Sequence, residues 1–261
     1  MKKGFTLAEG ATHVAQFPKP SCAAFTLAEV LITLGIIGVV AAMTLPTLIQ
    51  NYRKHEVETK LAKFYSVMNQ AIKLSEVENG EMSAWGNVKS GFEEDEDGNK
   101  DYSKPLNEAW LRKYIFPYLS AVEINKIPNA EKFEVFFKDG SLALFGADSV
   151  IYYVNKNAYK LNGNTEGKAA YNQIDFGTRA FTFFIKRAHT CEYSTIPENQ
   201  KYSCDDSGLQ PYKIGWNGTE AMLRNDSRIG CNLNATNEAA YCTALIQLYG
   251  WKIPKDYPFK F

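Results

Sequence analysis

Twenty consecutive residues near the N-terminus, Val30 to Ile49, carry no charged side chain and are mostly apolar. A helix of about 20 predominantly apolar residues spans the ~30 Å hydrocarbon core of a bilayer. The rest of the sequence shows no comparable apolar helix against which this run would be buried in a soluble core. We therefore predict a transmembrane helix over residues 25–49. A buried core helix of a soluble protein is the alternative.

The same helix is predicted to continue beyond the membrane as an amphipathic segment. Its apolar positions recur every three or four residues, as expected for one buried stripe on a helix, and charged residues lie between them. The stripe consists of Val57, Leu61, Phe64, Met68, Ile72 and Ser75. Asn79-Gly80 is a typical helix stop, so we predict one helix over residues 25–79, about 80 Å long. Pro46 lies inside it and predicts a kink, because proline removes a backbone hydrogen bond.

Residues 1–24 are interpreted as a leader peptide outside the folded protein. Three lysines against one glutamate make this stretch net positive, and a basic segment before an apolar one tends to stay in the cytoplasm. Two prolines oppose a continuous helix there. We therefore expect a single-pass inner-membrane protein whose head lies outside the cytoplasm.

The remaining residues, 80–261, are predicted to form an α+β head. Two strands flank Asp139-Gly140, a strong signal for a β-hairpin. The predicted strands are 133–137, 141–145, 150–154 and 180–185. One short helix is predicted within 106–119, ending near Pro117, and another over 238–248, and an acidic loop is predicted at 91–101. The predicted fold class is a long transmembrane and amphipathic helix packed on an antiparallel β-sheet, with Leu61, Phe64, Met68 and Ile72 anchoring the sheet.

The last third of the chain holds four of the five cysteines, Cys191, Cys204, Cys231 and Cys242. An even set beyond a membrane segment favours two disulfides in an oxidising compartment. Pairing Cys191 with Cys204 and Cys231 with Cys242 would close short loops, each contributing about 3 kcal/mol. All three connectivities remain open. Zinc is less favoured than disulfides, because no CxxC pair is present.

One short motif opens the apolar run, Phe25-Thr-Leu-Ala-Glu29. Residues 25–55 resemble the N-terminal segment of type IV pilins and of type II secretion pseudopilins. The resemblance implies that a prepilin peptidase cuts between Ala24 and Phe25 and methylates the new Phe25 amine. Glu29 would then be the fifth residue of the mature chain and Pro46 the twenty-second, the positions that the family uses.

Two features depart from the family pattern. The family usually has glycine before the cut, where this chain has Ala24. The same pentapeptide also occurs twenty residues earlier, after Gly4 at residues 5–9. Residues 10–18, directly after that copy, cannot span a membrane. We therefore assign the cut to Ala24–Phe25, with Gly4–Phe5 as the alternative.

Glu29 is the residue to which the resemblance assigns a role in assembly. A carboxylate in a membrane helix costs about 2.5–3.5 kcal/mol or more, and buried charges persist when they are paired. The freed Phe25 amine of a neighbouring copy would supply that partner and fix the axial register between subunits. The alternative is a glutamate that reaches the membrane interface by itself.

The function implied is that of a structural subunit, a pilin or pseudopilin, in a type IV pilus or a type II secretion filament. The implied partners are homologous pilin or pseudopilin subunits, the prepilin peptidase, an inner-membrane assembly platform and membrane lipid. After assembly the subunit would lie in a periplasmic or cell-surface filament. Two alternatives are a single-span surface-anchored binding protein that does not polymerise and a minor pilin at a filament tip.

Other functions find little support in the sequence. Lys plus Arg equal Asp plus Glu at 29 each, so no global field attracts nucleic acid, and we expect none as a partner. No catalytic motif is present, and we expect no enzyme activity, cofactor or metal. Calcium at the acidic loop is an alternative, although Lys104 stands where an EF-hand-like loop would need glutamate. A second alternative for calcium is Asp205 with Asp206.

Overall fold

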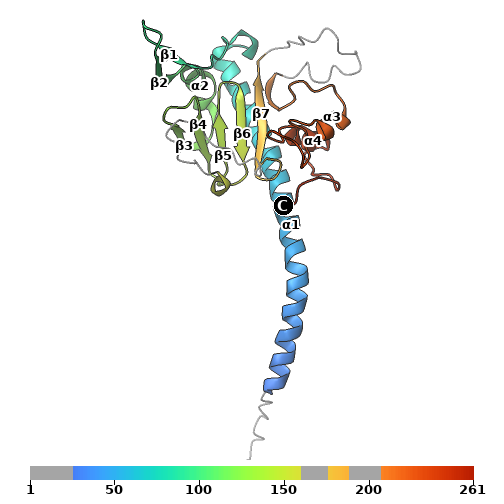
Figure 1. Ribbon diagram of the computed structural model, residues 1–261. Coiled ribbons are helices and arrows are strands. Elements are labelled where there is room, and N and C mark those ends of the chain that lie inside the picture. The colour runs from blue at the N-terminus through green and yellow to red at the C-terminus, as the bar shows by residue number, and fades with distance from the viewer. Residues whose placement is uncertain (1–25, 160–175, 188–206) are drawn as a thin grey trace, which may run out of the picture. The chain divides into compact units, whose positions relative to one another are not determined.

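The computed structural model describes residues 26–159, 176–187 and 207–261 (Figure 1). The chain separates into two compact units, Met1–Thr47 and Leu48–Phe261. Helix α1, Leu27–Asn79, passes from the first unit into the second. The predicted end of this helix at Asn79 is confirmed.

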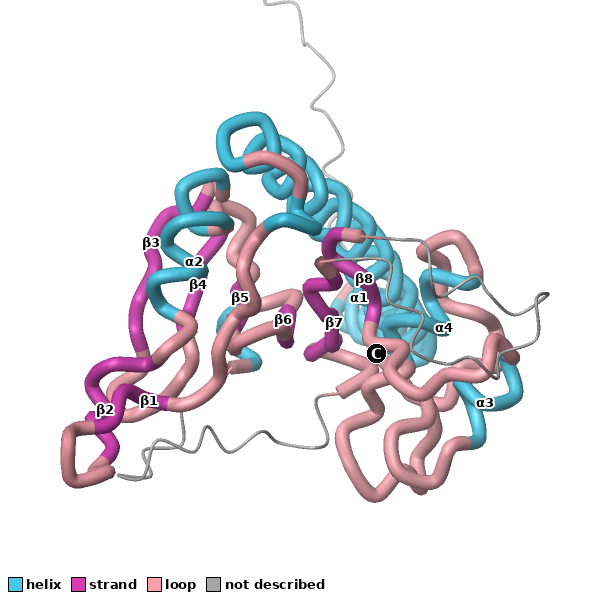
Figure 2. The backbone as a smooth tube through the Cα atoms, turned by 90° about the horizontal axis from the view of Figure 1, so that it is seen from above, coloured by secondary structure: helices cyan, strands magenta, loops and turns pink. Residues whose placement is uncertain are grey.

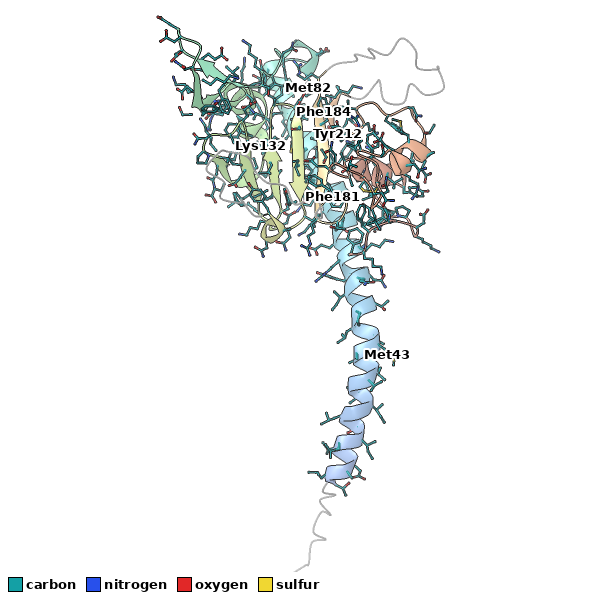
Figure 3. The ribbon with its side chains drawn as sticks, viewed as in Figure 1. Met43, Met82, Lys132, Phe181, Phe184 and Tyr212 are labelled. Atoms are coloured by element: carbon teal, nitrogen blue, oxygen red, sulfur yellow. A yellow bond between two sulfur atoms is a disulfide. The ribbon has the colours of Figure 1, made fainter. Side chains whose placement is uncertain are left out.

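Helix α1 continues through Pro46. Proline has no N–H to donate to the carbonyl four residues earlier, so the kink expected at this position stays a prediction. Within the first unit the apolar side chains of α1 are exposed, as Leu31 and Ile36 show at 61% each. Met43 of the first unit is also exposed, whereas Met82 of the second unit is buried (Figure 3).

The second half of α1 buries the stripe predicted from the sequence. All six predicted positions of the stripe, from Val57 to Ser75, are buried. Phe64 stacks on Tyr152 of the sheet with ring centroids 4.1 Å apart. The predicted anchoring of the sheet on this stripe is therefore confirmed.

The second unit is built on a six-stranded antiparallel sheet with the strand order β3-β4-β5-β6-β7-β8 (Figure 2). Each strand pairs with the next strand in the sequence, so the sheet is a meander. The strands are β3 Ala121–Lys126, β4 Phe133–Phe137, β5 Leu142–Phe145, β6 Ser149–Tyr153, β7 Ala180–Lys186 and β8 Gly208–Pro211. The α+β fold predicted from the sequence is confirmed.

The two faces of the sheet are covered by different parts of the chain. Side chains alternate along a strand, so Ala143 and Phe145 of β5 join the core beneath α1. Leu142 and Leu144 of the same strand join a second core that includes residues of α4, Cys242–Leu248. This alternation explains why all four residues of β5 are buried.

The predicted turn at Asp139-Gly140 does join β4 to β5. Gly140 has a φ of 77°, a conformation that glycine adopts without steric cost. The Asp139 carboxylate accepts a hydrogen bond from the backbone N–H of Ser141 at 3.2 Å. The four strands β4 to β7 were predicted, whereas the edge strands β3 and β8 were not.

The acidic segment is a small hairpin and not the loop that was predicted. Its strands are β1, Phe92–Glu94, and β2, Lys100–Pro105. The Asp95 carboxylate accepts the backbone N–H groups of Asn99 at 2.8 Å and Asp97 at 3.0 Å. These hydrogen bonds lower the pKa of the Asp95 carboxyl, and the bond from the backbone of Asn99 has the largest effect. The Asp95 carboxylate, which lies in the acidic segment considered for calcium, therefore closes its own turn.

The short helices are smaller than predicted. Helix α2, Glu108–Tyr114, lies within the predicted range 106–119 but ends before the predicted end near Pro117, where the 3₁₀ turn η2, Phe116–Tyr118, follows. Helix α4 begins only at Cys242, whereas the prediction began at residue 238. The further elements are α3 Glu220–Asn225, η1 Met82–Ala84 and η3 Lys156–Ala158.

Candidate membrane and assembly segment

Helix α1 begins with three hydrogen bonds between Thr26 and Glu29, which run in both directions. The backbone N–H and the hydroxyl of Thr26 each donate to Oε2 of Glu29 at 2.9 Å. In return, the backbone N–H of Glu29 donates to Oγ1 of Thr26 at 3.2 Å. This is a capping box, which satisfies backbone donors that a helix start otherwise leaves unpaired.

The sequence reasoning assigned Glu29 to assembly but missed this local role. The signal was present, because threonine followed three residues later by glutamate is the pattern of a capping box. Both hydrogen bonds that the Glu29 carboxylate accepts end on the same oxygen, Oε2. Within the described part of the chain, Oε1 of Glu29 accepts no hydrogen bond, so one carboxylate oxygen remains open to a cation.

The first part of α1 presents an apolar surface all around its circumference. Seven large apolar residues between positions 31 and 40 are at least half exposed: Leu31, Ile32, Leu34, Ile36, Ile37, Val39 and Val40. A continuous apolar surface of this kind is not stable in water. By length and composition, α1 is the one helix among the described residues that could cross a membrane.

The hydroxyl groups within the apolar run are satisfied by the helix itself. Thr33 donates to the carbonyl oxygens of Glu29 and Val30, both at 2.9 Å. Thr44 donates to the carbonyl oxygen of Val40 at 3.0 Å. Lipid offers no hydrogen-bond partners, so internal satisfaction is what a membrane environment requires.

A buried carboxylate on α1, Glu58, fastens the C-terminal segment to the helix. Its Oε1 accepts the backbone N–H of Ile253 at 2.9 Å, and its Oε2 accepts the ammonium of Lys252 at 2.9 Å. Burial raises the pKa of this carboxyl, but these two partners more than offset that effect, and its pKa lies below the usual value. Sequence reasoning missed this joint, because Glu58 is one of the charged residues that lie between the apolar positions of the stripe.

The cysteine prediction is confirmed for one pair. Cys231 and Cys242 form a disulfide with an S–S distance of 2.04 Å. Cys191 and Cys204 lie outside the described residues, as do Ala24 and Phe25 at the predicted cut and Asp205 and Asp206. Among the residues that the structure describes, no group of three or more His, Cys, Asp or Glu side chains could hold a metal ion.

Comparison with known proteins divides the chain close to the boundary between the two units. Residues 19–45 match the prokaryotic N-terminal methylation motif, and residues 47–261 match a family of unknown function, DUF6613. No curated protein and no solved structure matches the chain. The chain therefore belongs to the DUF6613 family, and its methylation motif makes it a type IV pilin-like precursor that a prepilin peptidase processes.

Proposed function

We propose that the mature chain is a structural, non-enzymatic subunit of a type IV pilus or type II secretion filament. The observation that carries the proposal is Glu29, one carboxylate at the start of an otherwise uncharged membrane helix. Its predicted place, the fifth of the mature chain, follows from the cut within the matched motif at residues 19–45.

The hydrogen bonds of Glu29 leave it suited to a second partner. The capping box occupies Oε2, while Oε1 has no partner among the described residues. A carboxylate in a low-dielectric environment is stabilised most by an opposite charge. The Phe25 amine of an adjoining copy would provide that charge, and the pairing would set the stagger between neighbouring helices.

The head would lie outside the cytoplasm before and after assembly. The Cys231–Cys242 disulfide supports this topology, because structural disulfides persist in oxidising compartments. The net positive charge of residues 1–24 supports the same orientation. The subunit would wait in the inner membrane and enter a periplasmic or surface filament.

Three variants separate the charge of Glu29 from its capping role. Glu29→Gln keeps a residue that suits a capping box but removes the charge, whereas Thr26→Ala removes the cap and leaves the charge. Glu29→Ala removes both. We expect all three variants to be cut and inserted. Only the two Glu29 variants should lose assembly, by about tenfold or more, because the buried charge pair would then lack its carboxylate.

The measurement is the fraction of the chain recovered in sheared filaments, with the mature N-terminus checked by mass spectrometry. Normal assembly of Glu29→Gln with poor assembly of Thr26→Ala would show that the cap, and not the charge pair, is what assembly needs. Absence of the processed wild-type chain from every filament fraction would contradict the filament role. It would favour a surface-anchored protein that does not polymerise.

A further inference from the structure

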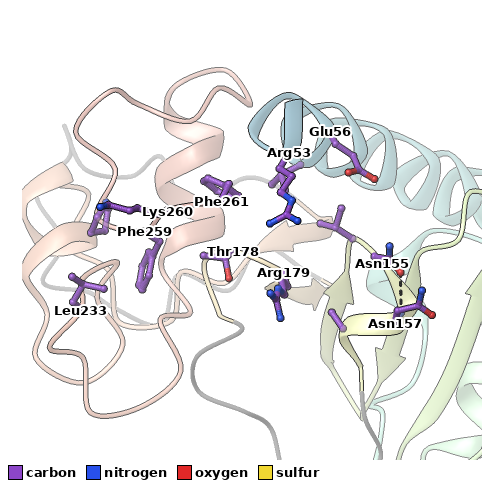
Figure 4. Close-up of a pocket in the computed structure, with 14 residues that line it drawn as sticks. Arg53, Glu56, Asn155, Asn157, Thr178, Arg179, Leu233, Phe259, Lys260 and Phe261 are labelled. Carbon is purple, nitrogen blue, oxygen red and sulfur yellow. Dashed lines mark hydrogen bonds between the residues drawn. The ribbon is translucent and has the colours of Figure 1, made fainter. Parts of the chain in front are cut away.

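A pocket of about 680 Å³ opens within the second unit (Figure 4). Its wall is formed by α1, by the turn that follows β6, by the turn before β7 and by the C-terminal segment. Each of these four segments contributes side chains to the wall, for example, in the same order, Val57, Asn157, Thr178 and Phe259. The pocket therefore joins segments that lie far apart in the sequence.

The charged side chains that line the pocket are mostly positive. Arg53, Arg179 and Lys260 contribute three cations. The one acidic side chain in the lining, Glu56, is already paired with Lys60 at 2.9 Å. Within the described residues, neither Arg53 nor Lys260 has an ion-pair or hydrogen-bond partner. Such a lining attracts an anion.

Apolar side chains lie beside these cations. Phe259 and Phe261 are partly buried in the pocket wall, and Leu233 is 72% exposed at its edge. Figure 4 shows these side chains on the wall formed by the C-terminal segment and its neighbouring loop. An exposed leucine next to cations suits a ligand that has both an anionic and an apolar part.

The position of the pocket along α1 relates it to the membrane surface. Arg53 is the first charged residue after Glu29, and it lies four residues beyond Ile49. At 1.5 Å per residue this is a rise of about 6 Å. The headgroup layer of a bilayer is roughly 5–7 Å thick on each side. The end of the pocket at Arg53 is therefore within reach of lipid headgroups.

We propose that this pocket binds the phosphate headgroup of an anionic phospholipid in the leaflet next to the head. Arg53, Arg179 and Lys260 would hold the phosphate, and Leu233 with the two phenylalanines would contact the glycerol and the first part of the acyl chains. Basic residues near a bilayer surface are attracted to anionic lipids. Binding would keep the head at the bilayer surface until the subunit is assembled.

The test uses the full chain purified in a non-ionic detergent and titrated with lipid, with native mass spectrometry counting the bound molecules. We expect phosphatidylglycerol to bind at least about tenfold more tightly than phosphatidylcholine, as a charge-assisted contact would give. The double variant Arg53→Gln/Lys260→Gln should lose this preference. The matched control Lys89→Gln/Lys255→Gln removes two exposed lysines outside the pocket and should keep it.

Unchanged phosphatidylglycerol binding in the pocket variant would overturn the proposal. So would equally tight binding of glycerol 3-phosphate or inorganic phosphate, which would identify a free phosphate as the ligand. The proposal would also be overturned if the acidic β1–β2 hairpin of a second copy of the chain occupied the pocket and prevented lipid from binding. An unchanged melting temperature and an intact Cys231–Cys242 bond confirm that each variant is folded. The assay uses isolated subunits, so its result is independent of whether the chain forms filaments.

Discussion

A single buried carboxylate, Glu58, connects helix α1 to the C-terminal segment of the second unit. Glu58 is 8% exposed, and both of its carboxylate oxygens accept a hydrogen bond from the segment at Lys252 and Ile253. A charge is stable in such a place only when hydrogen bonds and an opposite charge replace water. The residue therefore holds the two segments together in its ionised form.

Glu58→Gln tests this joint. Glutamine loses the charge and one of the acceptor oxygens, so we expect unfolding in detergent micelles to be easier by about 1–3 kcal/mol at pH 7. The pKa of Glu58 is below 4.5 in the folded chain, so the joint stabilises the fold above pH 4.5 and weakens as the pH falls through the lowered value.

The measurement is urea unfolding of wild type and variant at pH 7 and near pH 3. We expect the difference between them to shrink at the lower pH. Glu56→Gln is the control, because its partly buried ion pair with Lys60 joins residues four apart on one helix and should change stability by about 0.5 kcal/mol or less. A difference that grows toward acid pH would contradict the account.

A second single residue, Gly208, allows α1 to approach the sheet edge. The side chain of Asn69 donates to the carbonyl of Leu209 at 3.1 Å and accepts its N–H at 2.9 Å. Gly208 has a φ of 114°, and a Cβ there would collide with Oδ1 of Asn69. The close contact is possible only because residue 208 has no side chain.

Gly208→Ala should therefore lower the free energy of unfolding by about 1–3 kcal/mol, from strain at a positive φ and a disturbed Asn69 contact. Gly86→Ala is the matched control, because a Cβ at residue 86 meets no atom within 4 Å. Equal stability of the two variants in thermal unfolding would show that the Asn69 contact does not depend on the glycine.

At the scale of elements, the segment between α3 and α4 depends on local bonds more than on secondary structure. Residues 226–241 contain no helix or strand. The Asp226 carboxylate accepts the backbone N–H groups of Arg228 and Ile229, and the Cys231–Cys242 disulfide closes the segment against the start of α4. The disulfide therefore adds a covalent constraint to the hydrogen bonds of this segment.

Replacing both cysteines, Cys231→Ser with Cys242→Ser, should destabilise the head by about 3 kcal/mol, because a loop of this length regains its entropy in the unfolded chain. The measurement is thermal unfolding with and without reductant. The wild type should lose stability on reduction, and the variant should lose less. A variant as stable as the oxidised wild type would show that the bond is dispensable.

The elements that were predicted correctly are those whose side-chain pattern repeats. The stripe from Val57 to Ser75 has the period of a helix, and the Asp139-Gly140 turn marks β4 and β5. Strand β3 carries Glu123 and Lys126, and β8 is four residues long with a terminal Gly and Pro. These edge strands exist because a neighbouring strand supplies hydrogen bonds, which local sequence does not reveal. The capping box at Thr26 could also have been predicted, because the sequence has threonine followed three residues later by glutamate.

At the scale of the whole molecule, the chain combines a prepilin segment with the DUF6613 head. The methylation motif ends at residue 45, and the DUF6613 match begins at residue 47. The boundary between the two compact units, after Thr47, falls at the same place. The segment suited to lipid and the segment suited to water are therefore separate along the chain, joined by one helix.

The mature N-terminus tests the central claim most directly. The chain would be expressed with its prepilin peptidase, extracted from membranes and analysed by intact-mass and N-terminal peptide mass spectrometry. The account predicts a chain that begins with N-methylated Phe25 and has lost residues 1–24. A chain that still carries Met1, or that begins at Phe5, would contradict it.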